Sequence, residues 1–115
     1  MLSTSFSNNI FSNNLTRYHS GSAGYGIWLD EAYSNYVYSN LISGNSSAGI
    51  FLSNDANNNS FDYNIITSSC NDANGIEIST SSNNSIYSND ITTFGQSSPA
   101  IYVYTSSINL SLIHI

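Results

Sequence analysis

Four segments of the chain open with the same alternation of apolar and variable positions, which is the pattern of a short β-strand. The openings are Gly26-Ile27-Trp28-Leu29, Gly49-Ile50-Phe51-Leu52, Gly75-Ile76-Glu77-Ile78 and Ala100-Ile101-Tyr102-Val103. Side chains two positions apart point to the same face of a strand. We therefore expect two inward aliphatic columns: Ile27, Ile50, Ile76 and Ile101 in the first, and Leu29, Leu52, Ile78 and Val103 in the second.

A second signature repeats at a similar phase, with the form Asn, any, apolar, any, any, Asn, any, apolar. Its four copies are Asn8–Leu15, Asn35–Ile42, Asn59–Ile66 and Asn84–Ile91. A strand bend at the second Asn of each copy would turn the apolar residues on both sides of it inward. The predicted inward residues are Ile10, Val37, Phe61 and Ile86 before the bend, and Leu15, Ile42, Ile66 and Ile91 after it.

The repeated asparagines form two predicted columns where the strands bend. Asn tolerates the left-handed backbone conformation, bonds nearby backbone groups and can form amide ladders between stacked strands. We interpret these residues as architectural and weigh a ligand-binding role as the lesser alternative. The columns are Asn8, Asn35, Asn59 and Asn84, and Asn13, Asn40, Asn64 and Asn89.

The two signatures together predict an all-β fold, a right-handed parallel β-helix of about four coils of 23–27 residues. The polar segments between them, which end at Tyr25, Ala48, Asn74 and Pro99, are expected to be loops. A disordered Ser/Asn-rich tract is the rival interpretation, but it would not place Ile at the same phase in every copy. We assign residues 1–109 to the solenoid, with coils near 1–25, 26–48, 49–74, 75–99 and 100–109.

Both ends of the sequence are expected to be cut, which would make the chain a truncated fragment. It starts inside a signature, and no signal peptide precedes that signature. Residues 110–115 form a doubtful tail that resembles translated read-through of a sequencing adapter. Neighbouring coils of a longer parent chain are therefore expected partners.

Composition narrows the classes of partner. Charged residues make up 7% of the chain, Arg17 is the only Lys or Arg, and the formal net charge is −6. A nucleic-acid partner would require a basic surface, so we predict none. No apolar run approaches the ~20 residues of a membrane span, so membrane insertion is not expected. Cys70 is the only cysteine, which excludes an internal disulfide.

At the Gly-Ile-Xaa-Leu and Asn-Xaa-Ile-Xaa-Xaa-Asn-Xaa-Ile motifs, the chain resembles the right-handed parallel β-helix repeat family, in particular its NosD-like members. The resemblance covers roughly residues 8–103. It implies an extracellular, periplasmic or cell-surface location. It does not imply one function, because this architecture hosts polysaccharide lyases, glycoside hydrolases, adhesins and copper-site maturation factors.

No complete catalytic or metal site can be assembled from the sequence, and we predict no catalytic residue, metal or cofactor. Hydrolysis of a glycosidic bond needs two carboxylates about 5 to 9.5 Å apart, and the acids on the predicted strands have no acidic neighbours in adjoining coils. A lyase would need Arg or Lys as its base, and Arg17 is the only candidate. The copper-binding residue types His19, Cys70, His114 and Met1 are scattered over different coils.

One outward column offers a candidate binding surface. Trp28, Phe51 and Tyr102 project from the first strand of their coils with Glu77 between them, and Tyr36 and Tyr38 lie on an adjacent outward face. Exposed aromatic rings with polar groups beside them can hold sugar rings, although aromatic residues also simply favour strands. We therefore predict a noncatalytic extracellular or cell-envelope module, structural or adhesive, whose possible partner is a polysaccharide or cell-surface glycan. The alternatives are a fragment of a carbohydrate-active β-helix enzyme and, less favoured, a NosD-type copper-site maturation protein.

Overall fold

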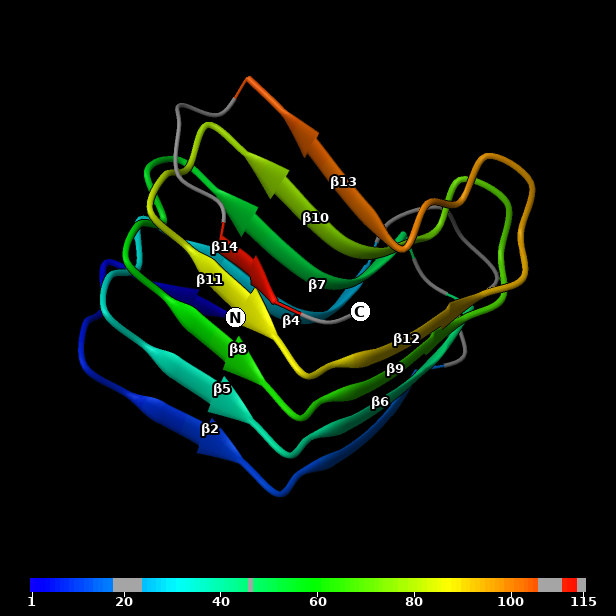
Figure 1. The fold of residues 1–115 in the computed structure, drawn as a ribbon, viewed down its shortest axis with the longest axis horizontal. Helices are drawn as coiled ribbons and strands as arrows, with labels where there is room; N and C mark the ends of the chain where they lie inside the picture. The colour runs from blue at the N-terminus through cyan, green and yellow to red at the C-terminus, as the bar shows by residue number, and fades with distance from the viewer. Residues whose placement is uncertain (18–23, 46, 106–110, 114–115) are drawn as a thin grey trace.

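The computed structural model describes residues 1–17, 24–45, 47–105 and, for the backbone alone, 111–113. Within these residues the chain forms only short parallel strands, and each turn of the chain adds one strand to each of three sheets. Figure 1 shows the three sheets around a common interior. The chain is thus a parallel β-helix of about four coils, as the repeats predict.

The first sheet has the longest strands, and its order follows the coils. It contains β1 (Leu2–Ser3), β4 (Tyr25–Asp30), β7 (Ala48–Ser53), β10 (Asn74–Ser79) and β13 (Ile101–Tyr104). The second sheet contains β2 (Asn9–Phe11), β5 (Tyr36–Tyr38), β8 (Ser60–Asp62), β11 (Ser85–Tyr87) and β14 (Ser111–Ile113). The third contains β3 (Asn14–Arg17), β6 (Leu41–Gly44), β9 (Ile65–Ser68) and β12 (Asp90–Thr93).

The register between coils is the one that the sequence repeats predict. In the first sheet, Ile76 pairs with Ile50 on one side and with Ile101 on the other. In the second and third sheets, Phe61 pairs with Ile86, and Ile66 with Ile91. A shift of one residue would have turned every aliphatic side chain outward, so the inward columns fix the pairing.

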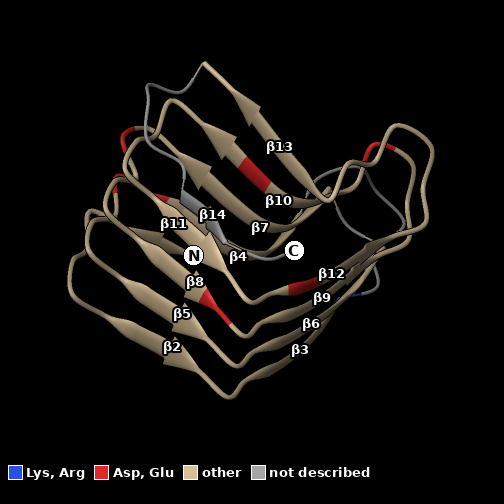
Figure 2. Ribbon diagram, viewed as in Figure 1, with Lys and Arg blue, Asp and Glu red and all other residues tan. Residues whose placement is uncertain are grey.

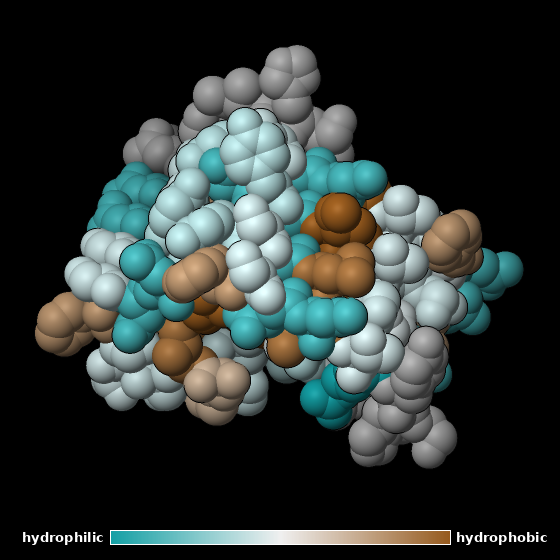
Figure 3. Space-filling view, turned by 90° about the horizontal axis from the view of Figure 1, so that it is seen from below, coloured by the Kyte–Doolittle hydropathy of each residue, from teal (hydrophilic) through white to brown (hydrophobic). Residues whose placement is uncertain are grey.

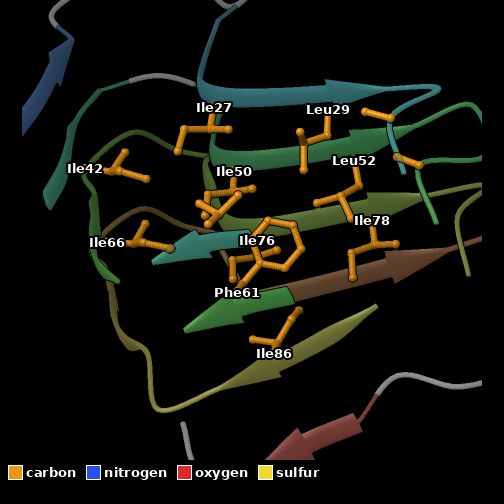
Figure 4. Close-up of a cluster of buried hydrophobic side chains, with 13 residues drawn as sticks. Ile27, Leu29, Ile42, Ile50, Leu52, Phe61, Ile66, Ile76, Ile78 and Ile86 are labelled. Carbon is orange, nitrogen blue, oxygen red and sulfur yellow. The ribbon is translucent and has the colours of Figure 1, made fainter. Parts of the chain in front are cut away.

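The inward columns form one apolar core between the three sheets (Figure 4). Leu29, Ile50, Leu52, Phe61 and Ile76 have no exposed surface. The core opens at both ends of the described stack. Val103 is 42% exposed on β13, the edge strand of the first sheet, although its column was predicted to point inward throughout. In the first coil, Leu2, Ile10 and Leu15 are only partly buried, and the view from below shows hydrophobic patches between hydrophilic ones (Figure 3).

A column of glycines lets the first and third sheets approach each other. A Cβ atom on Gly49 would collide with the side chain of Ile66 and would lie 2.7 Å from the carbonyl oxygen of Gly75. Gly26 and Gly75 occupy the same place in their coils, where Ile42 and Ile91 fill the space that a side chain would need. The glycine that opens each predicted strand is thus explained by close packing.

The two Asn columns lie at the corners of the coils and are joined by hydrogen bonds from coil to coil. Asn64 is fully buried, and its Oδ1 accepts bonds from the backbone N (3.1 Å) and the Nδ2 (3.0 Å) of Asn40. Its own Nδ2 donates to Asn89 Oδ1 and to the carbonyl of Val37, both at 2.9 Å. Asn59 has the same four kinds of bond in the other column. Each side chain therefore satisfies backbone groups that would otherwise be buried without partners.

The left-handed conformation lies one residue earlier than the sequence suggested. The eight asparagines do not have positive φ; the residue before each of them does, for example Tyr63 (φ 51°) before Asn64 and Ser39 (φ 53°) before Asn40. The expectation that the asparagines themselves adopt the left-handed conformation was therefore wrong, whereas the expected bonds to nearby backbone groups are present. The preceding residue makes the turn, and the Asn follows because its amide reaches into the corner and bonds to the next coil.

The corner between the third sheet and the first is irregular. The segments after β9 and after β12 form the loops that project from the stack (Figure 1). The predicted loop boundaries need correction here, since Tyr25, Ala48 and Asn74 already belong to the strands of the first sheet. The corner between the second and third sheets has one turn residue and one Asn in every coil. The corner between the first and second sheets is one residue longer after β7 than after β4, so most of the difference in coil length falls at the corner between the third sheet and the first.

Candidate functional site

The predicted outward row lies on the outer face of the first sheet. The register pairs Trp28 with Phe51, Phe51 with Glu77, and Glu77 with Tyr102, so the four side chains follow one another across β4, β7, β10 and β13. Tyr102 is 46% exposed, and the other three are half-buried. The structure thus brings together four of the six residues of the candidate carbohydrate site.

Three aromatic rings form a compact cluster at one end of this row. The ring of Tyr25 stacks on Phe51 with 4.4 Å between centroids, and it lies 5.5 Å from Trp28 at a tilt of 59°. Trp28 and Phe51 are 6.1 Å apart. We call Tyr25, Trp28 and Phe51 the aromatic cluster. The sequence interpretation missed Tyr25 because it was assigned to the loop, although an aromatic residue directly before the strand-opening Gly26 was a usable signal.

Polar side chains hold the indole ring of Trp28 in place. Its Nε1 donates a hydrogen bond to Ser53 Oγ at 2.9 Å, and Ser53 Oγ donates to Asp30 Oδ1 at 2.9 Å. Asn54 Nδ2 also donates to Asp30 Oδ1, at 2.7 Å. The chain of bonds fixes the ring edge, so the aromatic surface is formed before any ligand arrives.

The carboxylate of Glu77, the only one in the outward row, is held in position by a hydrogen bond. Asn74 Nδ2 donates to Glu77 Oε2 at 3.1 Å. Burial raises the pKa of the Tyr25 phenol, and the negative charge of Glu77 and then Tyr104 add to the effect. Tyr104 lies beside Tyr102 with 5.3 Å between ring centroids, and it was not among the predicted residues. The phenol of Tyr25 therefore stays protonated and can donate a hydrogen bond at neutral pH.

Two hollows lie at the edge of this face, beside the corner between the third sheet and the first. One, of about 320 Å³, is lined by Asp72, Asn74, Ser97, Pro99 and Tyr102. The other, of about 330 Å³, is lined by Met1, Arg17, Gly24, Tyr25 and Trp28. Both volumes are at the lower end of the range for small-molecule sites.

The remaining two predicted residues lie on a different face, the outer side of the second sheet. Tyr36 and Tyr38 stack with 4.5 Å between centroids, and Tyr38 stacks on Phe11 at 5.1 Å. The hydroxyl of Tyr36 donates to Asp62 Oδ2 at 3.0 Å and lies 3.5 Å from the hydroxyl of Tyr87. The hydrogen bond with Tyr87, then burial and Asp62, raise the pKa of Tyr36. The six candidate residues thus form two surfaces on different sheets.

The acidic residues do not gather on one element. Figure 2 shows them on β8, β10, β12 and on loops. In the register, Asp62 lies between Tyr38 and Tyr87, Asp90 lies beside Ile65, and Asp30 lies beside Ser53. These are the neighbours that the repeats predict. The pair of carboxylates needed for glycoside hydrolysis is therefore not formed by the acids on the described strands.

Copper chemistry needs His, Cys or Met side chains that converge. Among the described residues, no group of three or more His, Cys, Asp or Glu side chains is close enough to hold a metal ion. Met1 lines the hollow beside Trp28 in the first coil, whereas Cys70 lies in the loop between β9 and β10, where its carbonyl accepts a bond from Ser98. His19 and His114 lie outside the described residues. The donors that the structure describes do not fit a copper site.

Comparison with known proteins identifies the family. The model of the family described as "Periplasmic copper-binding protein (NosD)" matches residues 1–111. No curated protein and no solved structure gives a significant match. In the part of the chain that the structure describes, no helix is long and apolar enough to cross a membrane. The family match covers almost the whole chain and agrees with the stacked coils, and the chain therefore belongs to the NosD family.

Proposed function

We propose that the chain is a noncatalytic binding module that contacts polysaccharide through the outer face of the first sheet. The observation that carries the proposal is the aromatic cluster, three adjoining rings on β4 and β7, two strands whose inward aliphatic side chains are buried. Apolar faces of sugar rings stack on such rings, and polar groups beside them fix the orientation of the sugar.

The polar groups are present on the same face. The phenol of Tyr25 and the carboxylate of Glu77 lie next to the rings, and Asn74 holds the carboxylate in position. The protein would lose little conformational entropy when a ligand binds, because the hydrogen bonds from Trp28 to Ser53 and from Ser53 to Asp30 already hold the cluster in place.

The family supports a location outside the cytoplasm. Its description is that of a periplasmic protein. We accordingly place the module in the periplasm or on the cell surface, where polysaccharides are accessible. Its role there would be structural or adhesive, since the acids on the described strands do not pair with one another in the register and the described sulfur donors lie in different coils.

Affinity electrophoresis in gels that contain soluble polysaccharides tests this proposal. The panel is hydroxyethyl cellulose, xyloglucan, glycol chitosan and polygalacturonate. We expect at least one neutral or basic polymer to retard the wild-type protein, and we expect the double variant Trp28→Ala/Phe51→Ala to migrate as it does in an empty gel.

A matched variant controls for the loss of exposed aromatic surface in general. Phe6 and Phe94 are 73% and 71% exposed and lie outside the first sheet. The variant Phe6→Ala/Phe94→Ala should be retarded like the wild type, with the same circular dichroism spectrum in all three proteins. Equal retardation of all three, or no retardation of the folded wild type, would contradict the proposal.

A further inference from the structure

The hollow lined by Asp72, Asn74, Ser97, Pro99 and Tyr102 has features that the aromatic cluster lacks. Tyr102 and Pro99 give it an apolar wall, and Asn74 and Ser97 give it hydrogen-bonding groups. None of its lining residues is basic. It continues the outer row at the end opposite to the cluster, because Tyr102 belongs to β13 and Trp28 to β4.

The walls of this hollow are held together by the two neighbouring loops. The backbone N of Asp72 donates to the carbonyl of Gln96 at 2.9 Å, and the backbone N of Gln96 donates to Asn71 Oδ1 at 2.9 Å. Ser98 Oγ accepts from the backbone N of Ala73 at 3.1 Å and donates to the carbonyl of Cys70 at 3.0 Å. These four bonds join the loop before β10 to the loop before β13, so the hollow has a fixed shape.

Its charge is negative. Asp72 is a lining residue, and Asn74, which also lines the hollow, donates to the carboxylate of Glu77. Arg17, the only Lys or Arg in the sequence, lines the other hollow, beside Tyr25 and Trp28. A negatively charged ligand unit would meet like charge here, and a positively charged one would meet the carboxylate of Asp72, with the carboxylate of Glu77 next to Asn74 of the lining.

We propose that this hollow is a subsite for an amino sugar, a hexosamine unit whose free amine is protonated. The inference rests on the proposed function, because the rest of the glycan would lie on the aromatic cluster. The sugar ring would stack on Tyr102, its hydroxyls would bond to Asn74 and Ser97, and its ammonium group would lie near Asp72 and Glu77. The ligand class is therefore a partly or fully de-N-acetylated polysaccharide, in preference to a uronate or a sulfated polymer.

Isothermal titration calorimetry at pH 6 and low salt tests this subsite with three tetrasaccharides. These are tetraglucosamine, its N-acetylated counterpart and tetragalacturonate. An exposed charge pair is worth up to about fivefold in affinity. We expect the wild type to bind tetraglucosamine about fivefold more tightly than the N-acetylated tetramer, and tetragalacturonate most weakly.

Two isosteric variants test whether the preference for the amino sugar depends on Asp72. Asp72→Asn should reduce the preference for tetraglucosamine to near parity with the N-acetylated tetramer. Asp55→Asn is the matched control, since Asp55 and Asp72 are both exposed and both left-handed, with φ of 61° and 57°, a conformation that Asn tolerates. It should keep the wild-type preference. Equal binding of the two tetramers by the wild type, or equal losses in both variants, would overturn the subsite.

The aromatic variant separates the two proposals. Suppose that the wild type binds the tetramers with equal affinity and that Trp28→Ala/Phe51→Ala abolishes this binding. The proposed function then stands, and the amino-sugar subsite is contradicted. If that variant keeps both its affinity for tetraglucosamine and the dependence on Asp72, the subsite stands and the aromatic cluster is not the binding surface. If the wild type binds none of the tetramers, both the proposed function and the subsite are contradicted.

Discussion

The two faces of the first sheet differ in how strictly their residues repeat. On the inner face, one column is Ile in all four coils, at Ile27, Ile50, Ile76 and Ile101, and its neighbours pair in register. On the outer face, the adjacent column is Trp, Phe, Glu and Tyr. Packing between coils restricts the inner residues, because a side chain of another size would open a cavity or cause overlap. The outer residues are not restricted in this way, and the candidate binding surface lies among them.

The corners of the coils show the same contrast. Asn ladders occupy two corners in each coil, and their amides bond to each other and to the backbone. The corner between the third sheet and the first differs most from coil to coil, and the hollow beside Tyr102 is formed there. We infer that the repeated corners stabilise the solenoid and that the irregular corner is free to form binding sites.

The largest effect is expected from a charge placed on the inner face. Ile76 has no exposed surface, so Ile76→Asp would bury a carboxylate without a partner, at a cost of about 5 kcal/mol or more, comparable to the stability of a whole domain. Circular dichroism should show loss of the β spectrum at 25 °C. Ser12→Asp, at an exposed left-handed turn, should keep the spectrum. Similar behaviour of both variants would contradict the assignment of inner and outer positions.

The next effect is expected from the Asn ladder. Asn64→Ala would leave the backbone N–H of Asn40 buried without its acceptor and remove two bonds that Asn64 Nδ2 donates. We expect the free energy of unfolding, measured by urea titration, to fall by about 3 kcal/mol. Asn9→Ala is the control, at an exposed position of β2, and should change it by less than about 0.5 kcal/mol. A small loss for Asn64→Ala would mean that the ladder is dispensable.

A smaller effect is expected from the glycine column. Gly49→Ala would place a methyl group against Ile66 and the carbonyl of Gly75, and overpacking of this kind costs about 1 to 3 kcal/mol. Ala100 occupies the equivalent position in the last coil, so Ala100→Gly should cost no more than about 1 kcal/mol. Thermal unfolding of the two variants compares them directly. Equal shifts would show that the glycines are not required for close packing.

The smallest effect concerns the second aromatic surface and depends on pH. The pKa of Tyr36 is raised in the folded protein by its bond with Tyr87, by burial and by Asp62. Its contribution to stability is therefore fully present below the unfolded pKa of about 10 and is lost as the pH rises through the higher folded value. We expect the urea midpoint of the wild type to fall between pH 9 and pH 11, and that of Tyr36→Phe to fall less. An equal decrease of the urea midpoint in both proteins would exclude the ionisation of Tyr36 as its cause.

The sequence predicted those parts of the molecule that repeat. Ile76 and Asn64 could be placed because their counterparts recur at fixed phase, and a parallel stack turns equal phase into adjacency. Tyr25 could not be placed, because it precedes the repeated opening and has no aromatic counterpart in the other coils. The hollow beside Tyr102 could not be predicted either, since two loops of irregular sequence form it. Whether Tyr36 and Trp28 shared a surface depended on the angle between two sheets, which the repeats do not determine.

Nuclear magnetic resonance of Trp28 tests the central claim most directly, because the chain has one tryptophan and its indole N–H lies in the aromatic cluster, bonded to Ser53. Titration with tetraglucosamine should shift the indole N–H signal and backbone amides of β4, β7 and β10, and leave amides of the third sheet unchanged. Shifts confined to the second or third sheet, with the indole signal fixed, would contradict the account.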